Sequence, residues 1–142
     1  MYTYIFQKQM KTYALMDSQI IKVHEGSLKN FLNQLSLKNL FDLPGYKRQI
    51  FKLFQVSKKI PLYFNKELLL IPLININNYD VIYLNYFKIK RYQIFLKSVR
   101  IFMDDGTTFD YHHHITSFMR LIELSQSIIN IKEGKSYGEK NY

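Results

Sequence analysis

The chain has 142 residues, a formal net charge of +9 at pH 7 and no cysteine. This length predicts a single domain that buries a core without cross-links, and the lack of cysteine excludes disulfides, thiolate zinc sites and cysteine nucleophiles. The longest apolar run, Leu68–Ile74, contains Pro72 and is far too short to cross a bilayer. No signal-peptide pattern opens the sequence, so we expect a cytoplasmic protein with no membrane partner.

The positive charge is concentrated in the middle of the chain. Residues 43–103 hold eleven basic and two acidic side chains, a net charge of +9 that equals that of the whole chain. A basic surface gathered in one segment is typical of proteins that bind polyanions. The alternative is a solubilising surface in a chain whose composition is rich in lysine throughout.

The first 26 residues show short extended patterns. Met1–Gln9 alternates aromatic residues and predicts a short strand or a loose end. Thr12–Met16 and Gln19–Val23 flank Asp17-Ser18, which predicts a weak hairpin.

A helix start follows this extended region. Ser27 is a suitable N-cap, and four apolar residues follow it at helical spacing. They are Leu28, Phe31, Leu32 and Leu35. A strand followed by a short helix is the alternative assignment, and Leu43-Pro44-Gly45 predicts a turn that ends the region.

Strand-like runs dominate the middle of the chain. Ile50–Val56 favours a strand because Phe51, Leu53 and Phe54 have high or moderate strand preference. The later candidates are Leu62–Asn65, Leu68–Ile71, Val81–Asn85 and Phe87–Gln93. Pro61 and Pro72 place the strands beside them at an edge or end of the sheet, and Asn75–Asp80 predicts a polar loop.

The stretch Ile94–Ile129 has the clearest local signals. Asp104-Asp105-Gly106 lies between two apolar runs and predicts a hairpin closed by a type I′ turn. An amphipathic helix is predicted after it, and we expect this helix to cover one face of the sheet. Its apolar stripe contains Ile115, Phe118, Met119, Ile122 and Ile129, widened by Leu121, Leu124 and Ile128. Residues 1–133 are therefore expected to form one domain, and residues 134–142 a disordered polar tail.

Catalytic and metal-binding patterns are weak. His112-His113-His114 are consecutive and point in different directions in an extended chain, so we interpret them as a strand-to-helix junction with His114 or Thr116 near the N-cap. Asp104 and Asp105 are explained by the turn. No phosphate-binding glycine loop or nucleophile motif is present, so we predict no enzyme activity, no metal site and no cofactor.

Basic residues interleaved with aromatic residues are the candidate binding surface. In a strand over Phe87–Gln93, Lys88, Lys90 and Tyr92 would share one face, with Arg91 on the other. Lys97 and Arg100 are expected on the next strand, on opposite faces. The residues predicted to contact DNA are Tyr46, Lys47, Arg48, Lys58, Lys59, Lys88, Lys90, Arg91, Lys97 and Arg100.

The order of these features resembles the ComK-type competence transcription factors of low-GC Gram-positive bacteria. Six blocks between about Phe41 and Leu124 carry the resemblance, with Tyr83 where the family has tryptophan. The blocks are Phe41–Arg48, Val56–Leu62, Leu69–Leu73, Val81–Asn85, Val99–Tyr111 and Ile115–Phe118.

This resemblance implies a DNA-binding activator of competence genes. Such a protein would act as a homo-oligomer on paired AT-rich boxes of double-stranded DNA, mainly through phosphates and the minor groove, and an adaptor and a protease would regulate it. We expect an α+β fold, with a mainly antiparallel sheet covered by the C-terminal helix. The alternative function is that of a divergent paralogue that modulates another protein and does not bind DNA.

Overall fold

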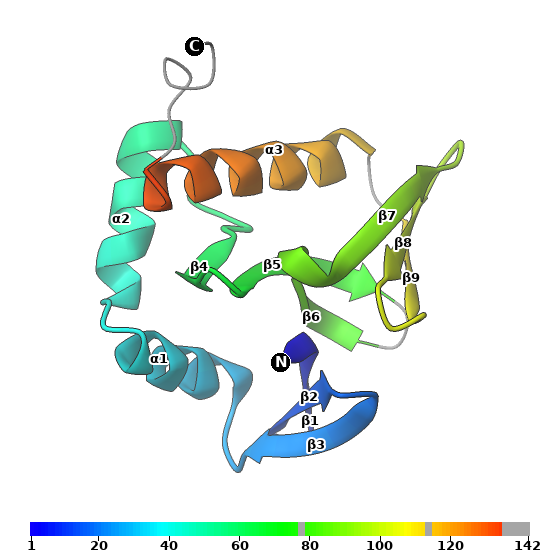
Figure 1. The fold of residues 1–142 in the computed structure, drawn as a ribbon, viewed down its shortest axis with the longest axis horizontal. Helices are drawn as coiled ribbons and strands as arrows, with labels where there is room; N and C mark the ends of the chain where they lie inside the picture. Colours follow the sequence, from blue (N-terminus) through cyan, green and yellow to red (C-terminus); the bar gives the residue numbers. More distant parts are fainter. Residues whose placement is uncertain (77–78, 113–114, 135–142) are drawn as a thin grey trace.

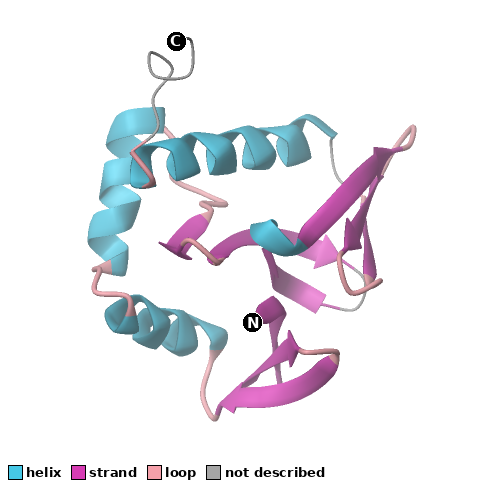
Figure 2. Cartoon of the chain, in the orientation of Figure 1, coloured by secondary structure: helices cyan, strands magenta, loops and turns pink. Residues whose placement is uncertain are grey.

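The computed structural model describes residues 1–76, 79–112 and 115–134. The chain is an α+β protein with two antiparallel sheets and a C-terminal helix, as predicted (Figures 1 and 2). The larger sheet has the strand order β3-β2-β1-β6-β5-β4, and the smaller one has the order β7-β8-β9. None of the helices in the described ranges has both the length and the hydropathy that a membrane span requires.

The N-terminal residues form a three-stranded meander. Its strands are β1 (Tyr2–Lys8), β2 (Lys11–Met16) and β3 (Gln19–His24). The predicted hairpin around Asp17-Ser18 is confirmed, and both turn residues have positive φ, of 50° and 65°. Short polar side chains tolerate this left-handed conformation better than most residues, which explains why the chain reverses there.

Two helices follow the meander. Helix α1 (Leu28–Lys38) begins after Ser27, whose Oγ accepts a hydrogen bond from the Asn30 N–H at 3.2 Å, so the predicted N-cap is confirmed. Helix α2 (Leu43–Phe54) stands where the sequence predicted a turn over Leu43-Pro44-Gly45 and a strand over Ile50–Val56, and both predictions are wrong.

Local chemistry explains why α2 is a helix. The Asp42 carboxylate accepts from the Gly45 N–H at 3.1 Å and caps the helix, and Pro44 lies in the first turn, where its missing N–H costs no hydrogen bond. Leu43, Tyr46 and Ile50 lie at helical spacing and are buried together. The strand preference of the phenylalanines is weaker than these combined signals.

The strands β4 (Leu62–Asn65), β5 (Leu68–Ile76) and β6 (Tyr79–Asn85) complete the larger sheet. β4 is an edge strand, as Pro61 predicted, whereas β5 lies between β4 and β6. Pro72 pairs with Tyr83 of β6 and lies past Leu70, the last described residue of β5 in register with β4. The loop predicted over Asn75–Asp80 is wrong at its two ends, which belong to β5 and β6, and Asn77 and Asn78 lie outside the described residues.

The smaller sheet follows a short 3₁₀ turn, η1 (Tyr86–Lys88). Its strands are β7 (Ile89–Ile94), β8 (Val99–Met103) and β9 (Thr108–Tyr111). The β8–β9 hairpin is confirmed, but its turn is a three-residue loop in which Gly106 has a φ of +94° and the two aspartates do not have positive φ. This geometry is that of a type I turn followed by a bulge, and the type I′ prediction is wrong.

Helix α3 (Ile115–Lys132) covers the sheets at the top of Figure 1. Phe118, Leu121, Ser125, Ile128 and Ile129 are its buried residues. The other predicted stripe members are partly buried against the same core: Ile115, Met119, Ile122 and Leu124. The predicted N-cap residue His114 and the predicted tail beyond Gly134 lie outside the described residues.

Candidate nucleic-acid interface

Helix α2 and the loop after it present a group of exposed cations. Lys47, Arg48 and Lys52 lie on the solvent side of the helix because the opposite side is buried in the core. Phe51 is exposed among them, and a shallow hollow of about 380 Å³ separates this side of α2 from Ser57. The pattern is that of an amphipathic helix whose outer face carries positive charge.

The loop after α2 continues this basic surface. Lys58 and Lys59 are exposed and line one side of a groove of about 390 Å³, whose other side is α3. From α3, Arg120 lines the groove together with Ser117, Ser127 and the carboxylate of Glu123. We call Lys47, Arg48, Lys52, Lys58, Lys59 and Arg120 the α2 basic surface.

Two members of the α2 basic surface were missed by the sequence prediction. Lys52 lay inside a predicted strand, so its place on the same helix face as Lys47 and Arg48 was hidden. Arg120 lies in a different part of the chain, and only the packing of α3 beside the loop brings it to Lys58 and Lys59. The sequence places Arg120 on the polar side of an amphipathic helix. This position predicts that the side chain is exposed, but it does not predict which residues lie beside it.

The sequence prediction placed Tyr46 among the DNA contacts, and the structure corrects this. Tyr46 is buried, its hydroxyl donates to the Pro61 carbonyl at 2.7 Å, and the same oxygen accepts from the Tyr63 N–H at 3.1 Å. Burial raises the pKa of Tyr46 to about 12. Tyr46 thus joins α2 to the start of β4 and has no ring face exposed for a base.

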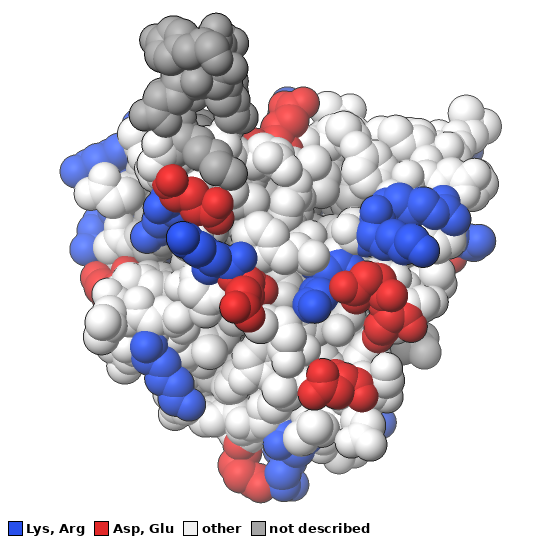
Figure 3. Space-filling model, in the orientation of Figure 1, with Lys and Arg blue, Asp and Glu red and all other residues white. Residues whose placement is uncertain are grey.

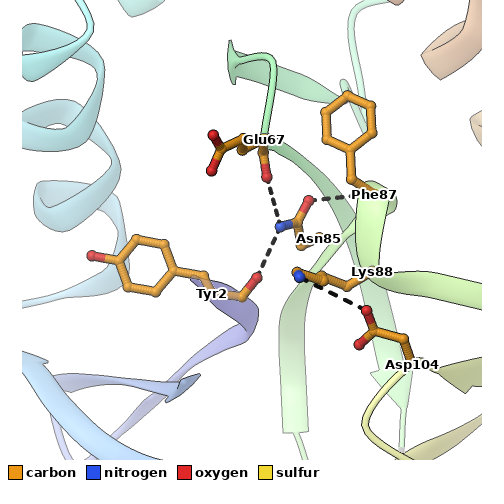
Figure 4. Close-up of polar contacts among 6 residues, drawn as sticks. All are labelled: Tyr2, Glu67, Asn85, Phe87, Lys88 and Asp104. Carbon is orange, nitrogen blue, oxygen red and sulfur yellow. Dashed lines mark hydrogen bonds and ion pairs between the residues drawn. The ribbon is translucent and has the colours of Figure 1, made fainter. Parts of the chain in front are cut away.

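The remaining predicted cations surround the β7–β8 hairpin. Lys88 lies in η1, not in a strand, and its ammonium is 3.8 Å from the Asp104 carboxylate (Figure 4). Lys90 is the extra residue of a bulge, because Ile89 and Arg91 pair with consecutive residues of β8. Lys97 lies in the hairpin loop rather than in β8.

Aromatic rings accompany the arginines of this hairpin. The Arg91 guanidinium stacks 3.7 Å from the centre of the Phe102 ring, and that of Arg100 lies 5.7 Å from the Phe95 ring. Arg100 also donates two hydrogen bonds to the Asp110 carboxylate, at 2.7 and 3.2 Å. Tyr92, which was expected to share a strand face with Lys88 and Lys90, packs edge-on against Phe118 of α3, with ring centres 5.1 Å apart.

A buried asparagine holds the start of this hairpin. Asn85 has no exposed surface, and its amide donates to the carbonyls of Tyr2 and Glu67 at 2.8 and 3.1 Å (Figure 4). Its carbonyl oxygen accepts from the N–H groups of Leu69 and Phe87 at 3.3 and 3.2 Å. This network ties β1, β5 and η1 together, so it sets where Lys88 and β7 leave the larger sheet.

The two groups of cations lie at opposite ends of the molecule. Figure 1 shows α2 at one side and the β7–β8 hairpin at the other, with α3 passing between them. On the face drawn in Figure 3, basic and acidic side chains are interspersed. The ten predicted residues therefore do not form one continuous face, and three of their cations, Arg48, Lys88 and Arg100, form ion pairs with carboxylates.

Comparisons with known proteins returned no matching family model, no matching curated protein and no matching solved structure.

Within the described part of the chain, histidines and carboxylates do not gather into a cluster of three or more that could hold a metal ion.

Proposed function

We propose that this protein binds double-stranded DNA, with the α2 basic surface as its main phosphate contact. The observation that carries the proposal is the run from Lys47 to Lys59, which has five basic residues and no acidic residue and is exposed along a helix and its following loop. The packing of Arg120 beside this run adds a sixth cation.

Electrostatics support a polyanion as the partner. The described carboxylates come within 4 Å of just one cation of this surface, Arg48, whose guanidinium is 3.8 Å from Asp42. Side chains of Lys and Arg that neutralise phosphates release condensed counterions. The logarithm of the binding constant therefore falls linearly with the logarithm of the salt concentration, with a slope of roughly −0.9 per phosphate contact. Four to six contacts of this kind would supply most of the binding free energy and make it strongly salt-dependent.

We further propose that the activity is that of a ComK-type activator of competence genes. The resemblance in the sequence supports this, and its first block, Phe41–Arg48, forms the cap and first turns of the helix that carries the basic surface. AT-rich duplexes, assembly into a homo-oligomer, a cytoplasmic location and control by an adaptor and a protease belong to the same proposal. AT-rich DNA suits a cationic surface because its narrow minor groove concentrates negative potential.

A salt titration of DNA affinity tests the proposal. Fluorescence anisotropy with AT-rich and GC-rich duplexes would be measured at several salt concentrations for the wild type and for Lys58→Ala/Lys59→Ala. We expect the double variant to bind more weakly and to lose roughly two units of salt slope. Lys29→Ala, an exposed cation on α1, is the matched control and should change neither value. An unchanged slope in the double variant would remove the α2 basic surface from the proposal.

A second candidate function is that of a paralogue that modulates another protein without binding DNA. The separation of the cations into two groups at opposite ends favours it, because a duplex contacts one continuous surface most readily. The same titration separates the two functions. Wild-type protein that fails to bind either duplex at low salt would favour the modulator.

A further inference from the structure

The tip of the β7–β8 hairpin exposes a run of large apolar side chains. Ile94, Phe95 and Leu96 are 51%, 42% and 90% exposed, and Lys97 follows them directly. Figure 1 shows this tip projecting past the rest of the molecule. Three consecutive exposed apolar residues are costly in a protein that works alone in water, so the tip needs a partner to cover it.

The backbone holds this tip in a defined shape. Ile94 is in register with Val99, and the Phe95 N–H donates to the Ser98 carbonyl at 2.8 Å, so Leu96 and Lys97 form a tight two-residue loop. On the inner face of the same hairpin, Val99 and Ile101 are fully buried. The apolar tip is thus carried on a ribbon that is anchored in the core.

The charge around the tip indicates what covers it. Of the five basic residues between Lys88 and Arg100, two are ion-paired with Asp104 and Asp110, and Lys90, Arg91 and Lys97 lie more than 4 Å from any described carboxylate. If a second copy of the chain paired with the exposed edge of β7, Lys90 and Arg91 would lie close to their own counterparts, and like charges facing each other destabilise a strand pair. A polyanion with flat apolar surfaces between its charges fits both features, and duplex DNA is such a partner.

We propose that the β7–β8 tip is a DNA wedge, in which Leu96 and Phe95 insert between adjacent base pairs while Lys97 contacts phosphate, so that the bound duplex bends. The inference rests on the proposed DNA binding and adds a second, chemically different contact to it. Apolar wedges of this kind partly unstack a base step and kink the duplex by roughly 20–90°. The wedge gives the hairpin a role apart from that of the α2 basic surface.

The wedge and the phosphate contacts have separable signatures. An apolar insertion releases no counterions, so removing it should reduce bending and leave the salt slope unchanged. Removing a phosphate contact should leave the bending unchanged and reduce the salt slope. Phe95→Ala/Leu96→Ala and Lys97→Ala are therefore the informative pair, and all three side chains are exposed, so the fold should survive their loss.

The experiment measures bending by the end-to-end energy transfer of a doubly labelled AT-rich duplex, with affinity and salt slope followed in parallel. We expect wild-type protein to shorten the end-to-end distance. Phe95→Ala/Leu96→Ala should return that distance to the unbound value and weaken binding on the order of tenfold, with an unchanged salt slope. Lys97→Ala should keep the bend and lose roughly one unit of slope. Leu37→Ala, which removes a 68% exposed leucine from α1, should match the wild type.

Three outcomes would overturn the wedge. The duplex could stay straight with wild-type protein bound, or the double variant could bend it as the wild type does. The double variant could also show a lower mass than the wild type in sedimentation without DNA, which would make the tip a contact between copies of the chain. Failure of the wild type to bind any duplex is a different result, because it would remove the proposed function itself.

Discussion

Removing the Asn85 side chain should cost more stability than most single substitutions in this protein. The Asn85 amide makes four hydrogen bonds, to backbone groups of Tyr2, Glu67, Leu69 and Phe87, and it is fully buried. A hydrogen bond of this kind contributes about 1 kcal/mol net, and buried partners left without one add their own desolvation cost. Asn85→Ala should therefore lower the free energy of unfolding by about 4 kcal/mol, a large part of the 5–15 kcal/mol typical of a domain.

Asn85→Asp tests the direction of the same hydrogen bonds. The introduced carboxylate can still accept from the Leu69 and Phe87 N–H groups, but it has no donor for the carbonyls of Tyr2 and Glu67. Burial next to two carbonyl oxygens should raise the pKa of this carboxyl above its unfolded value of about 3.9. The folded state then binds the proton more tightly, so the variant loses stability relative to wild type as the pH rises from about 4 through the folded pKa.

Urea denaturation followed by circular dichroism, at pH 4.5 and at pH 7, measures both variants. Asn85→Ala should show a large and nearly pH-independent loss, whereas the loss for Asn85→Asp should be greater at pH 7 than at pH 4.5. An Asn85→Ala loss below about 1 kcal/mol would mean that the four hydrogen bonds are not made as the structure places them. An Asn85→Asp loss that does not change with pH would refute the assigned donor direction.

Three further predictions concern single contacts. Tyr46→Phe should destabilise the protein by about 1–2 kcal/mol in urea, because it removes a hydroxyl with two buried backbone partners, and it should leave DNA affinity unchanged. Gly106→Ala should cost about 1 kcal/mol in the same assay, since Gly106 has a φ of +94° and no side-chain clash would add to that strain. A hydrogen bond from Arg100 holds the pKa of Asp110 below its usual value, so Arg100→Gln should raise that pKa in an NMR titration. An unshifted Asp110 titration would contradict the ion pair.

Much of the fold could be predicted wherever a local signal decided it. Ser27 as an N-cap, Asp17-Ser18 as a reversal and Asp104–Gly106 as a hairpin turn are chemical signals carried within a few residues. Helix α3 was predicted because its apolar spacing extends over five turns. The error at α2 came from weighing strand preference above the capping of Asp42, although both were present in the same short stretch.

The sequence predicted the excess of positive charge and most cations of the candidate site, but not how they are arranged. Counting residues placed the excess positive charge between residues 43 and 103. The count could not show that Arg120 lines the same groove as Lys58 and Lys59. It also could not show that Lys88 forms an ion pair with Asp104. Tyr46 was misassigned for the same reason, because basic residues follow it in sequence, while the fold buries it against Phe41 and the start of β4.

The sequence by itself determined the fold class and the excess of positive charge. It also determined three local features: the chain reversals at Asp17-Ser18 and Asp104–Gly106, and the helix cap at Ser27. Tertiary structure alone decided which aromatic rings are buried, which cations pair with carboxylates, and that the cations form an α2 basic surface and a separate hairpin with an apolar tip. The physical reason is the distance along the chain between the groups that interact. Caps and turns depend on atoms within a few residues, whereas burial and ion pairing depend on groups that only the folded chain brings together.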